Sequence, residues 1–139
     1  MERHRQLFHQ LSMLHKPYID WLNEILGKYN LNRPQWTIMY ILYHHGPHTL
    51  VEISKYQSIE KPAITRTVNS LEVQGFIKSI PCSDKRKKNI LLTDQGEELY
   101  KVVSREIDEF QLDKLTGITA EEQEKFLDII QRIRNNFNE

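Results

Sequence analysis

Apolar side chains near the start of the chain recur every three or four residues, the spacing that places them on one face of an α-helix. They are Leu7, Leu11, Leu14, Tyr18, Leu22, Ile25 and Tyr29. Pro17 falls inside this stripe. Because proline removes one backbone hydrogen bond from a helix, we expect either a kink at this position or two helices that meet there. The pattern predicts a long amphipathic helical segment that weakens at Gly27 and Asn30.

Three further helices are predicted in close succession, each with a start or stop signal. They cover about residues 33–43, 50–57 and 61–74. The first opens at Asn32, a capping residue, with Pro34 in its first turn, and it stops at residues 44–47. Thr49 caps the second helix. The third ends at Gly75, because glycine adopts left-handed backbone at low cost.

The helix predicted over residues 61–74 has two chemically different faces. Ile64, Val68 and Leu71 form an apolar stripe that faces inward. The opposite side carries polar and basic side chains, with Lys61 beside them: Pro62, Thr65, Arg66 and Asn69. We therefore expect this second face to be exposed.

After Gly75 the helical spacing gives way to two short, partly β-branched runs. They cover residues 76–80 and 89–92 and are separated by the polar segment 81–88. Two short strands around a polar turn region predict a β-hairpin.

Two amphipathic helices complete the prediction. The first is capped by Thr93 and runs to about Leu115, and the second begins at Thr119 with Glu122 completing a capping box. Their apolar stripes are Leu99, Val103, Ile107 and Phe110 in the first and Phe126, Ile130, Ile133 and Phe137 in the second.

A helix–turn–helix pair followed by a hairpin is the order of a winged helix–turn–helix. We therefore predict a mainly α fold in a single domain, residues 1–139, with a small β-hairpin wing. Residues 31–96 would form the DNA-binding lobe. Residues 1–30 together with 97–139 would form a helical dimerisation region, because their apolar stripes exceed what one small lobe can cover. This surface predicts a homodimer.

Length and composition agree with one globular domain. The chain has 139 residues, of which 39% are hydrophobic and 27% charged. Its longest apolar run, Ile38–Tyr43, is too short to span a bilayer, and its N-terminus has no secretory signal pattern. Cys82 is the single cysteine and has no internal partner, which is typical of a reducing compartment. We expect a cytoplasmic protein.

The net charge of zero conceals a sorting of charge along the chain. Residues 61–93 carry seven Lys or Arg against two acids, a balance of +5, whereas residues 94–139 carry six against twelve, a balance of −6. Such asymmetry favours a polyanion-binding patch in the middle of the chain. A solvated basic face balanced by the acidic tail is the alternative.

The residue types in this basic segment suit duplex DNA. The predicted helix carries Lys61, Thr65, Arg66 and Asn69 on adjacent faces. Arg66 can bridge guanine O6 and N7, and Asn69 can pair with adenine. The hairpin tip has four consecutive cations, suited to phosphates or a narrow minor groove: Lys85, Arg86, Lys87 and Lys88. Asp84 can hold the Arg86 guanidinium in position.

These segments resemble the MarR family of bacterial transcription regulators. The resemblance covers nearly the whole chain and is most specific over residues 63–77 and in the wing, where Asp84-x-Arg86 is followed by Leu92-Thr93-x-x-Gly96. Ser79 stands where the family often has an arginine, and the segment before Asp84 is one residue shorter than usual.

The family resemblance also implies a mode of binding. It implies a homodimer with interlocked first, fifth and sixth helices, two DNA-binding lobes and a palindromic operator. Carried over by position, Thr65, Arg66 and Asn69 would lie in the major groove, and Arg86 would reach the minor groove. The protein would most simply be a repressor.

The family typically binds small aromatic effectors between the dimer helices and the DNA lobe. Four aromatic side chains in the first two helices are our effector-binding prediction, with plain core packing as the alternative for each: Tyr18, Trp21, Trp36 and Tyr40. His44, His45 and His48 invite a metal-binding interpretation, but the last two helices contain no histidine or cysteine to complete a site. We expect no metal and no cofactor.

Two other functions stay open at this point. One is a protein-interaction module in which the basic face meets an acidic partner. The other is a thiol redox sensor through Cys82, which lies among cations that would favour its oxidation. An enzyme is not expected, because the chain has no nucleotide-binding glycine motif, nucleophile elbow or zinc-protease motif.

Overall fold

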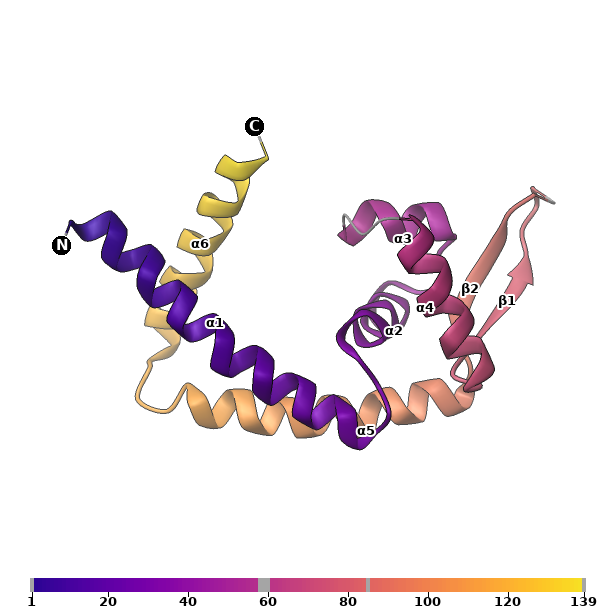
Figure 1. Cartoon of the computed structure of the whole chain (residues 1–139), viewed down its shortest axis with the longest axis horizontal. Helices are drawn as coiled ribbons and strands as arrows, with labels where there is room; N and C mark the ends of the chain where they lie inside the picture. The colour runs from indigo at the N-terminus through magenta and orange to yellow at the C-terminus, as the bar shows by residue number, and fades with distance from the viewer. Residues whose placement is uncertain (1, 58–60, 85, 139) are drawn as a thin grey trace. The chain divides into compact units, whose positions relative to one another are not determined.

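The computed structural model of the chain describes residues 2–57, 61–84 and 86–138. The elements are α1 (Arg3–Lys28), α2 (Arg33–His45), α3 (Leu50–Gln57), α4 (Lys61–Val73), β1 (Ile77–Pro81), β2 (Lys88–Leu92), α5 (Asp94–Lys114) and α6 (Ala120–Phe137) (Figure 1). The predicted mainly α winged helix–turn–helix is confirmed. The chain divides into two compact units, residues 1–107 and 108–139, and α5 runs through their boundary.

Helix α1 continues through Pro17, so the prediction that two helices meet there is wrong. Proline removes only the bond to the carbonyl four residues earlier, and the turns on either side keep theirs. The second half of α1 contributes Leu22, Ile25 and Leu26 to the core. The stripe residues of its first half are exposed, with Leu7 at 64% and Leu14 at 59%.

Hydrogen bonds at their first turns fix the starts of the helices. Three helices open with a reciprocal capping box, formed by Asn32 and Gln35 in α2, Thr49 and Glu52 in α3, and Thr119 and Glu122 in α6. At α5, the Thr93 hydroxyl accepts from the Gly96 N–H at 3.0 Å and donates to the Gly75 carbonyl at 2.6 Å. The caps predicted at Asn32, Thr49, Thr93 and Thr119 are therefore confirmed.

One apolar core holds the first unit together. Its fully buried members come from α1 to α5 and from β2: Leu26, Ile38, Met39, Ile41, Ile53, Ile64, Leu71, Ile90 and Val103. The stripe predicted for α4 is buried in full, since Ile64, Val68 and Leu71 are at most 4% exposed. Burial of this stripe turns the polar side of α4 toward solvent.

The base of the hairpin is anchored through both of its strands. Strands β1 and β2 pair antiparallel, with Ile77 opposite Leu92. Ile90 and His48 exchange two backbone hydrogen bonds, at 2.8 and 3.1 Å, which attach β2 to the segment before α3. Gly96 lies so close to Phe76 that an added Cβ would sit 2.0 Å from its carbonyl oxygen. The base of the wing thus has a fixed position against α3 and α5.

A polar cluster joins the end of α1 to α5. The Glu106 carboxylate accepts from the Tyr29 hydroxyl at 3.0 Å and lies 2.6 Å from Lys28 Nζ. The hydrogen bond from Lys28, with that from Tyr29, lowers the pKa of Glu106. The same bonds raise the pKa values of Lys28 and Tyr29. The cluster fixes α1 against α5 within the first unit.

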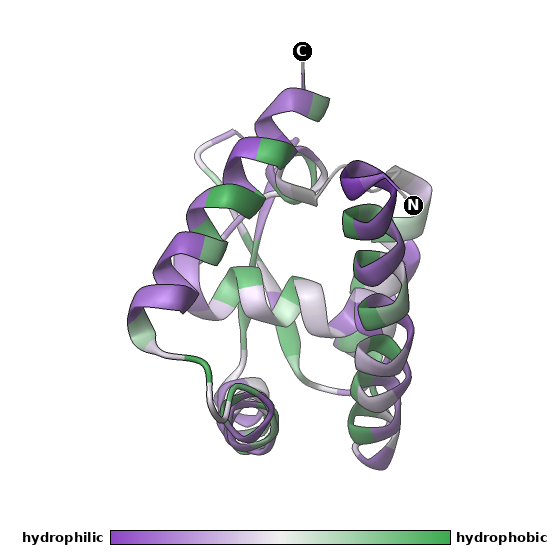
Figure 2. Ribbon diagram, turned by 90° about the vertical axis from the view of Figure 1, so that its left-hand side faces the viewer, coloured by the Kyte–Doolittle hydropathy of each residue, from purple (hydrophilic) through white to green (hydrophobic). Residues whose placement is uncertain are grey.

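The second unit comprises the end of α5 and helix α6. No residue of α6 is buried, although its apolar stripe follows the predicted spacing. Phe126 is 47% exposed, Ile133 38% and Phe137 76%. Figure 2 shows hydrophobic positions recurring along the helix that ends at the C-terminus.

Candidate nucleic-acid interface

The exposed face of α4 carries the polar side chains that the sequence predicts. Pro62, Thr65, Arg66 and Asn69 are all exposed, opposite the buried Ile64 stripe. The side chain of Lys61 lies outside the described residues. A hydrogen-bonding helix face of this kind has the chemistry needed to contact base edges.

The tip of the wing is basic and tightly turned. The Lys87 N–H donates to the Asp84 carbonyl at 3.0 Å, which closes the turn. Asp84 Oδ1 accepts from the Arg86 N–H at 3.0 Å and lies 3.6 Å from Arg86 Nε. The Arg86 side chain is 92% exposed, so this single contact leaves most of the guanidinium in solvent. Lys85 lies outside the described residues.

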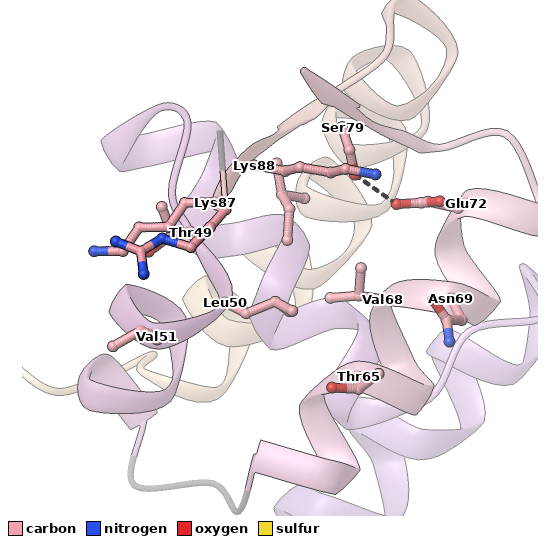
Figure 3. Close-up of a pocket in the computed structure, with 12 residues that line it drawn as sticks. Thr49, Leu50, Val51, Thr65, Val68, Asn69, Glu72, Ser79, Lys87 and Lys88 are labelled. Carbon is pink, nitrogen blue, oxygen red and sulfur yellow. Dashed lines mark hydrogen bonds between the residues drawn. The ribbon is translucent and has the colours of Figure 1, made fainter. Parts of the chain in front are cut away.

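A pocket of about 440 Å³ lies where α3, α4 and the wing meet (Figure 3). Its lining comprises Thr49, Leu50, Val51, Thr65, Val68, Asn69, Glu72, Ser79, Arg86, Lys87, Lys88 and Ile90. Five of the predicted DNA-binding residues line it: Thr65, Asn69, Arg86, Lys87 and Lys88. Pro62, Arg66 and Asp84 are not part of this lining. The pocket thus brings one face of α4 and the cations of the wing to the same hollow.

Seven of the twelve lining residues were not among the predicted site residues, and three of these seven are polar. Thr49 is the cap of α3, Glu72 lies near the end of α4, and Ser79 belongs to β1. Ser79 Oγ donates to Glu72 Oε1 at 2.7 Å, which links the wing to α4 (Figure 3). The helical spacing of Thr65, Asn69 and Glu72 is the one signal in the sequence that places Glu72 on the same face.

The electrostatics of the pocket are positive on the side of the wing. Arg86, Lys87 and Lys88 are exposed cations, and Glu72 is the acidic residue of the lining. Within residues 2–57, 61–84 and 86–138, no cation lies at ion-pair distance from the Glu72 carboxylate. The balance favours an anionic partner.

The four predicted effector-binding aromatics have different surroundings. Tyr18 and Trp21 contact each other on α1, with ring centroids 6.2 Å apart. Trp36 stacks on Tyr100 at 4.6 Å, and Tyr40 contacts the His44 ring at 4.4 Å.

Tyr100 of α5 is a buried aromatic residue that the sequence analysis missed. Its ring stacks on Trp36 and also on Tyr43, the latter at 4.3 Å. Its hydroxyl is 2.8 Å from His44 Nε2. This aromatic stack, Trp36–Tyr100–Tyr43, joins α2 of the helix–turn–helix to α5.

The three histidines near the end of α2 make separate contacts. His44 bonds the Tyr100 hydroxyl, His45 the Tyr56 hydroxyl, and His48 Nδ1 the Gly46 carbonyl. Across the described ranges, no three His, Cys, Asp or Glu side chains gather as metal ligands. In the same residues, no helix is both long and apolar enough to cross a membrane.

A polar recognition-type helix, a preceding helix packed against it and a basic hairpin beside both define a winged helix–turn–helix DNA-binding protein. The model of the MarR family matches residues 31–88. The HTH-type transcriptional regulator YwoH of Bacillus subtilis (strain 168) is 32% identical over 122 residues, which cover 88% of this chain and 89% of that protein. The chain belongs to the MarR family, whose members are transcription regulators and not enzymes.

Solved structures show the same fold. Staphylococcus aureus MarR in complex with salicylate and kanamycin has a TM-score of 0.87 at 29% identity, covering 96% of this chain and 91% of that one. A cysteine mutant of E. coli MarR in complex with operator DNA has a TM-score of 0.79 at 22% identity, covering 92% and 93%. At that level of identity, the second likeness concerns the fold alone.

Proposed function

We propose that the protein is a repressor that binds a palindromic operator as a homodimer and is released by a small aromatic effector. Thr65, Arg66 and Asn69 of α4 would contact bases in the major groove, and Arg86 would enter the minor groove. The observation that carries the proposal is the pocket shared by α4 and the wing. An exposed hydrogen-bonding helix face beside exposed cations is what a groove and its flanking phosphates require.

The wing would supply the phosphate contacts. Lys87 and Lys88 are exposed on the rim of the pocket, and they would neutralise phosphates and release counterions. Asp84 would orient Arg86 through the contacts described above. Lys61 and Lys85 belong to the proposed surface by their positions in the sequence.

The dimerisation region would comprise residues 1–30 and 97–139, with residues 31–96 as the DNA-binding lobe. Its support is apolar area: the first half of α1 and the length of α6 each carry a stripe of exposed apolar side chains. A second copy of the chain is the occupant that would cover the same stripes on both partners by two-fold symmetry. The two recognition helices would then lie about 34–36 Å apart, one turn of DNA.

The effector would contact Tyr18, Trp21, Trp36 and Tyr40, as aromatic walls suit a small aromatic ligand. The salicylate-bound form of the similar S. aureus protein supports this class of ligand. The position of Trp36 on α2, against α5, supports a coupling between a ligand and the DNA-binding lobe.

The direct test is a titration of the purified protein against a labelled duplex from its own upstream region, with a scrambled duplex as competitor. We expect preferential binding, a footprint with two-fold symmetry and a steep decrease in affinity with salt. Equal, weak binding to both duplexes would contradict sequence specificity. Failure to bind even at low salt would favour the protein-interaction module.

The effector part of the proposal has its own measurement. Salicylate added to the protein–duplex complex should release the DNA, and Tyr40→Ala should raise the concentration required. Release of the DNA by salicylate at an unchanged concentration in that variant would exclude Tyr40 from the site.

A further inference from the structure

Glu72 is an acidic side chain within the surface proposed to contact DNA. Residues 65, 69 and 72 of α4 are spaced by four and three positions, so their side chains share one narrow face of the helix. Thr65, Asn69 and Glu72 all line the pocket beside the wing (Figure 3). Glu72 is exposed, so its carboxylate is accessible to a molecule in that pocket.

The Glu72 carboxylate is hydrogen-bonded to the wing through one of its two oxygens. Ser79 Oγ, on the neighbouring strand β1, donates to Glu72 Oε1 at 2.7 Å. Ser79 is half-buried and belongs to a strand paired along its length, which makes it a rigid donor. One carboxylate oxygen is therefore occupied by the protein, while the second oxygen can accept from a ligand.

The chemistry of a carboxylate restricts what this oxygen can bind. An ionised carboxylate only accepts hydrogen bonds. In the major groove, guanine presents two acceptors and thymine one, so only cytosine and adenine present an amino donor. The adenine N6 donor lies beside the N7 acceptor, which repels a carboxylate, whereas the cytosine N4 amino group has no acceptor beside it on the same base. A phosphate would be repelled. The cations Arg86, Lys87 and Lys88, which line the same pocket, are the groups suited to phosphates.

We propose that Glu72 is a base-specificity residue that accepts a hydrogen bond from the N4 amino group of one cytosine in each half-site. Ser79 is its positioning residue, since its hydroxyl donates to one oxygen of the carboxylate. This assignment rests on the proposed function, because it requires the stripe of Thr65, Asn69 and Glu72 to face DNA. It adds an acidic reader to a helix face otherwise made of neutral and basic groups.

The test is selection from a randomised duplex library by the wild-type protein, Glu72→Gln, Ser79→Ala and the control Glu24→Gln on α1. Wild type and control should select the same motif, with one C·G pair per half-site favoured by about tenfold. Glu72→Gln should lose this preference, or exchange it for adenine, with the other positions unchanged. Ser79→Ala should weaken the same preference and no other. Circular dichroism checks that each variant is folded.

Three results would overturn the assignment, and they are distinguishable. If Glu72→Gln binds every duplex more tightly and keeps the cytosine, the carboxylate only repels phosphates. If preferences change at several positions in that variant, Glu72 supports the helix instead of reading a base. If wild-type protein selects no motif at all, the proposed DNA-binding function fails and this assignment fails with it.

Discussion

At the scale of single residues, Arg86 is the side chain of the wing best placed to enter a DNA groove. It stands on a closed turn, its backbone and guanidinium both contact Asp84, and almost all of its side chain is exposed. A guanidinium held at a tip can enter a narrow groove, where the negative potential is strongest. The loss of operator affinity when this side chain is removed therefore measures whether the wing enters the groove.

Replacement of Arg86 by alanine should weaken operator binding by about 1–3 kcal/mol, or roughly 5- to 150-fold in Kd. The measurement is a titration at fixed salt with the duplex that wild-type protein prefers. Lys16→Ala, which removes an exposed cation of α1, is the matched control and should leave the affinity unchanged. An unchanged Kd for Arg86→Ala would show that the wing does not enter the groove.

Gly96 is the residue at which a single methyl group should do most damage to the fold. An added Cβ would meet the Phe76 carbonyl oxygen at 2.0 Å, and that oxygen is held by a hydrogen bond from the Thr93 N–H. Gly96→Ala should lower the free energy of unfolding by about 1–3 kcal/mol or more, as overpacking does. Urea denaturation measures this change.

Gly27→Ala should change the free energy of unfolding in the opposite direction. A Cβ at Gly27 meets nothing within 4 Å, and the residue lies in α1, where alanine is favoured over glycine by about 0.5–1 kcal/mol. This variant should be slightly more stable than wild type. Equal stability of both glycine variants would contradict the close approach at Gly96.

The sequence indicates which residues belong to the candidate site better than it indicates which side chains they contact. Thr65, Asn69 and Arg86 follow from the polar face of a helix and from a run of cations, both of which are local patterns. Glu72 could not be assigned, because its partner Ser79 lies on a strand and their contact depends on how the wing packs. Tyr100 was missed for the same reason: its stacking partners and His44 come from another helix.

At the scale of elements, the helix ends are where sequence and structure agree most closely. Capping depends on side chains within three residues of each other, so Thr49 and Glu52 need no tertiary information to find their geometry. The Pro17 prediction failed in part, because a proline signals a missing hydrogen bond but not whether the helix continues beyond it. Local sequence signals therefore determine where helices start, whereas tertiary packing determines whether a helix continues past a proline.

The capping box of α3 should make stability depend on pH. The hydrogen bond from the Thr49 N–H, with that from its hydroxyl, lowers the pKa of Glu52 in the folded state. The stabilisation is present above the ordinary pKa of glutamate and is lost as the pH falls through the lowered value. Glu52→Gln should therefore lose less stability on acidification than wild type does.

Urea denaturation at neutral pH and in the acidic range gives the comparison for Glu52→Gln. The control is Glu124→Gln, which changes an exposed glutamate of α6 outside the capping box. It should lose as much stability on acidification as wild type does. The expectation fails if both variants lose stability with pH to the same degree as wild type.

At the scale of the whole molecule, the exposed apolar stripes support the proposed homodimer. A charge placed in such a stripe would be buried against apolar groups of the second copy, which is costly without a counter-charge. Ile133→Glu on α6 and Leu11→Glu on α1 should each shift the protein from dimer toward monomer. Sedimentation equilibrium measures the shift.

The control for this shift is Gln131→Glu, which puts a charge on α6 away from the stripe and should remain dimeric. The two stripe variants should also bind the palindromic duplex more weakly, because a monomer engages one half-site. If both stripe variants have the same dimer dissociation constant as wild type, these faces are not part of the interface.

The stack of Trp36, Tyr100 and Tyr43 gives the protein an optical reporter of its own. The indole of Trp36 lies 4.6 Å from the Tyr100 ring at an interplanar angle of 10°, so its emission depends on the separation of α2 from α5. The chain contains only one other tryptophan, Trp21, and a Trp21→Phe variant would isolate the signal of Trp36. A movement of the lobe against α5 on DNA binding would then be recorded in solution without a label.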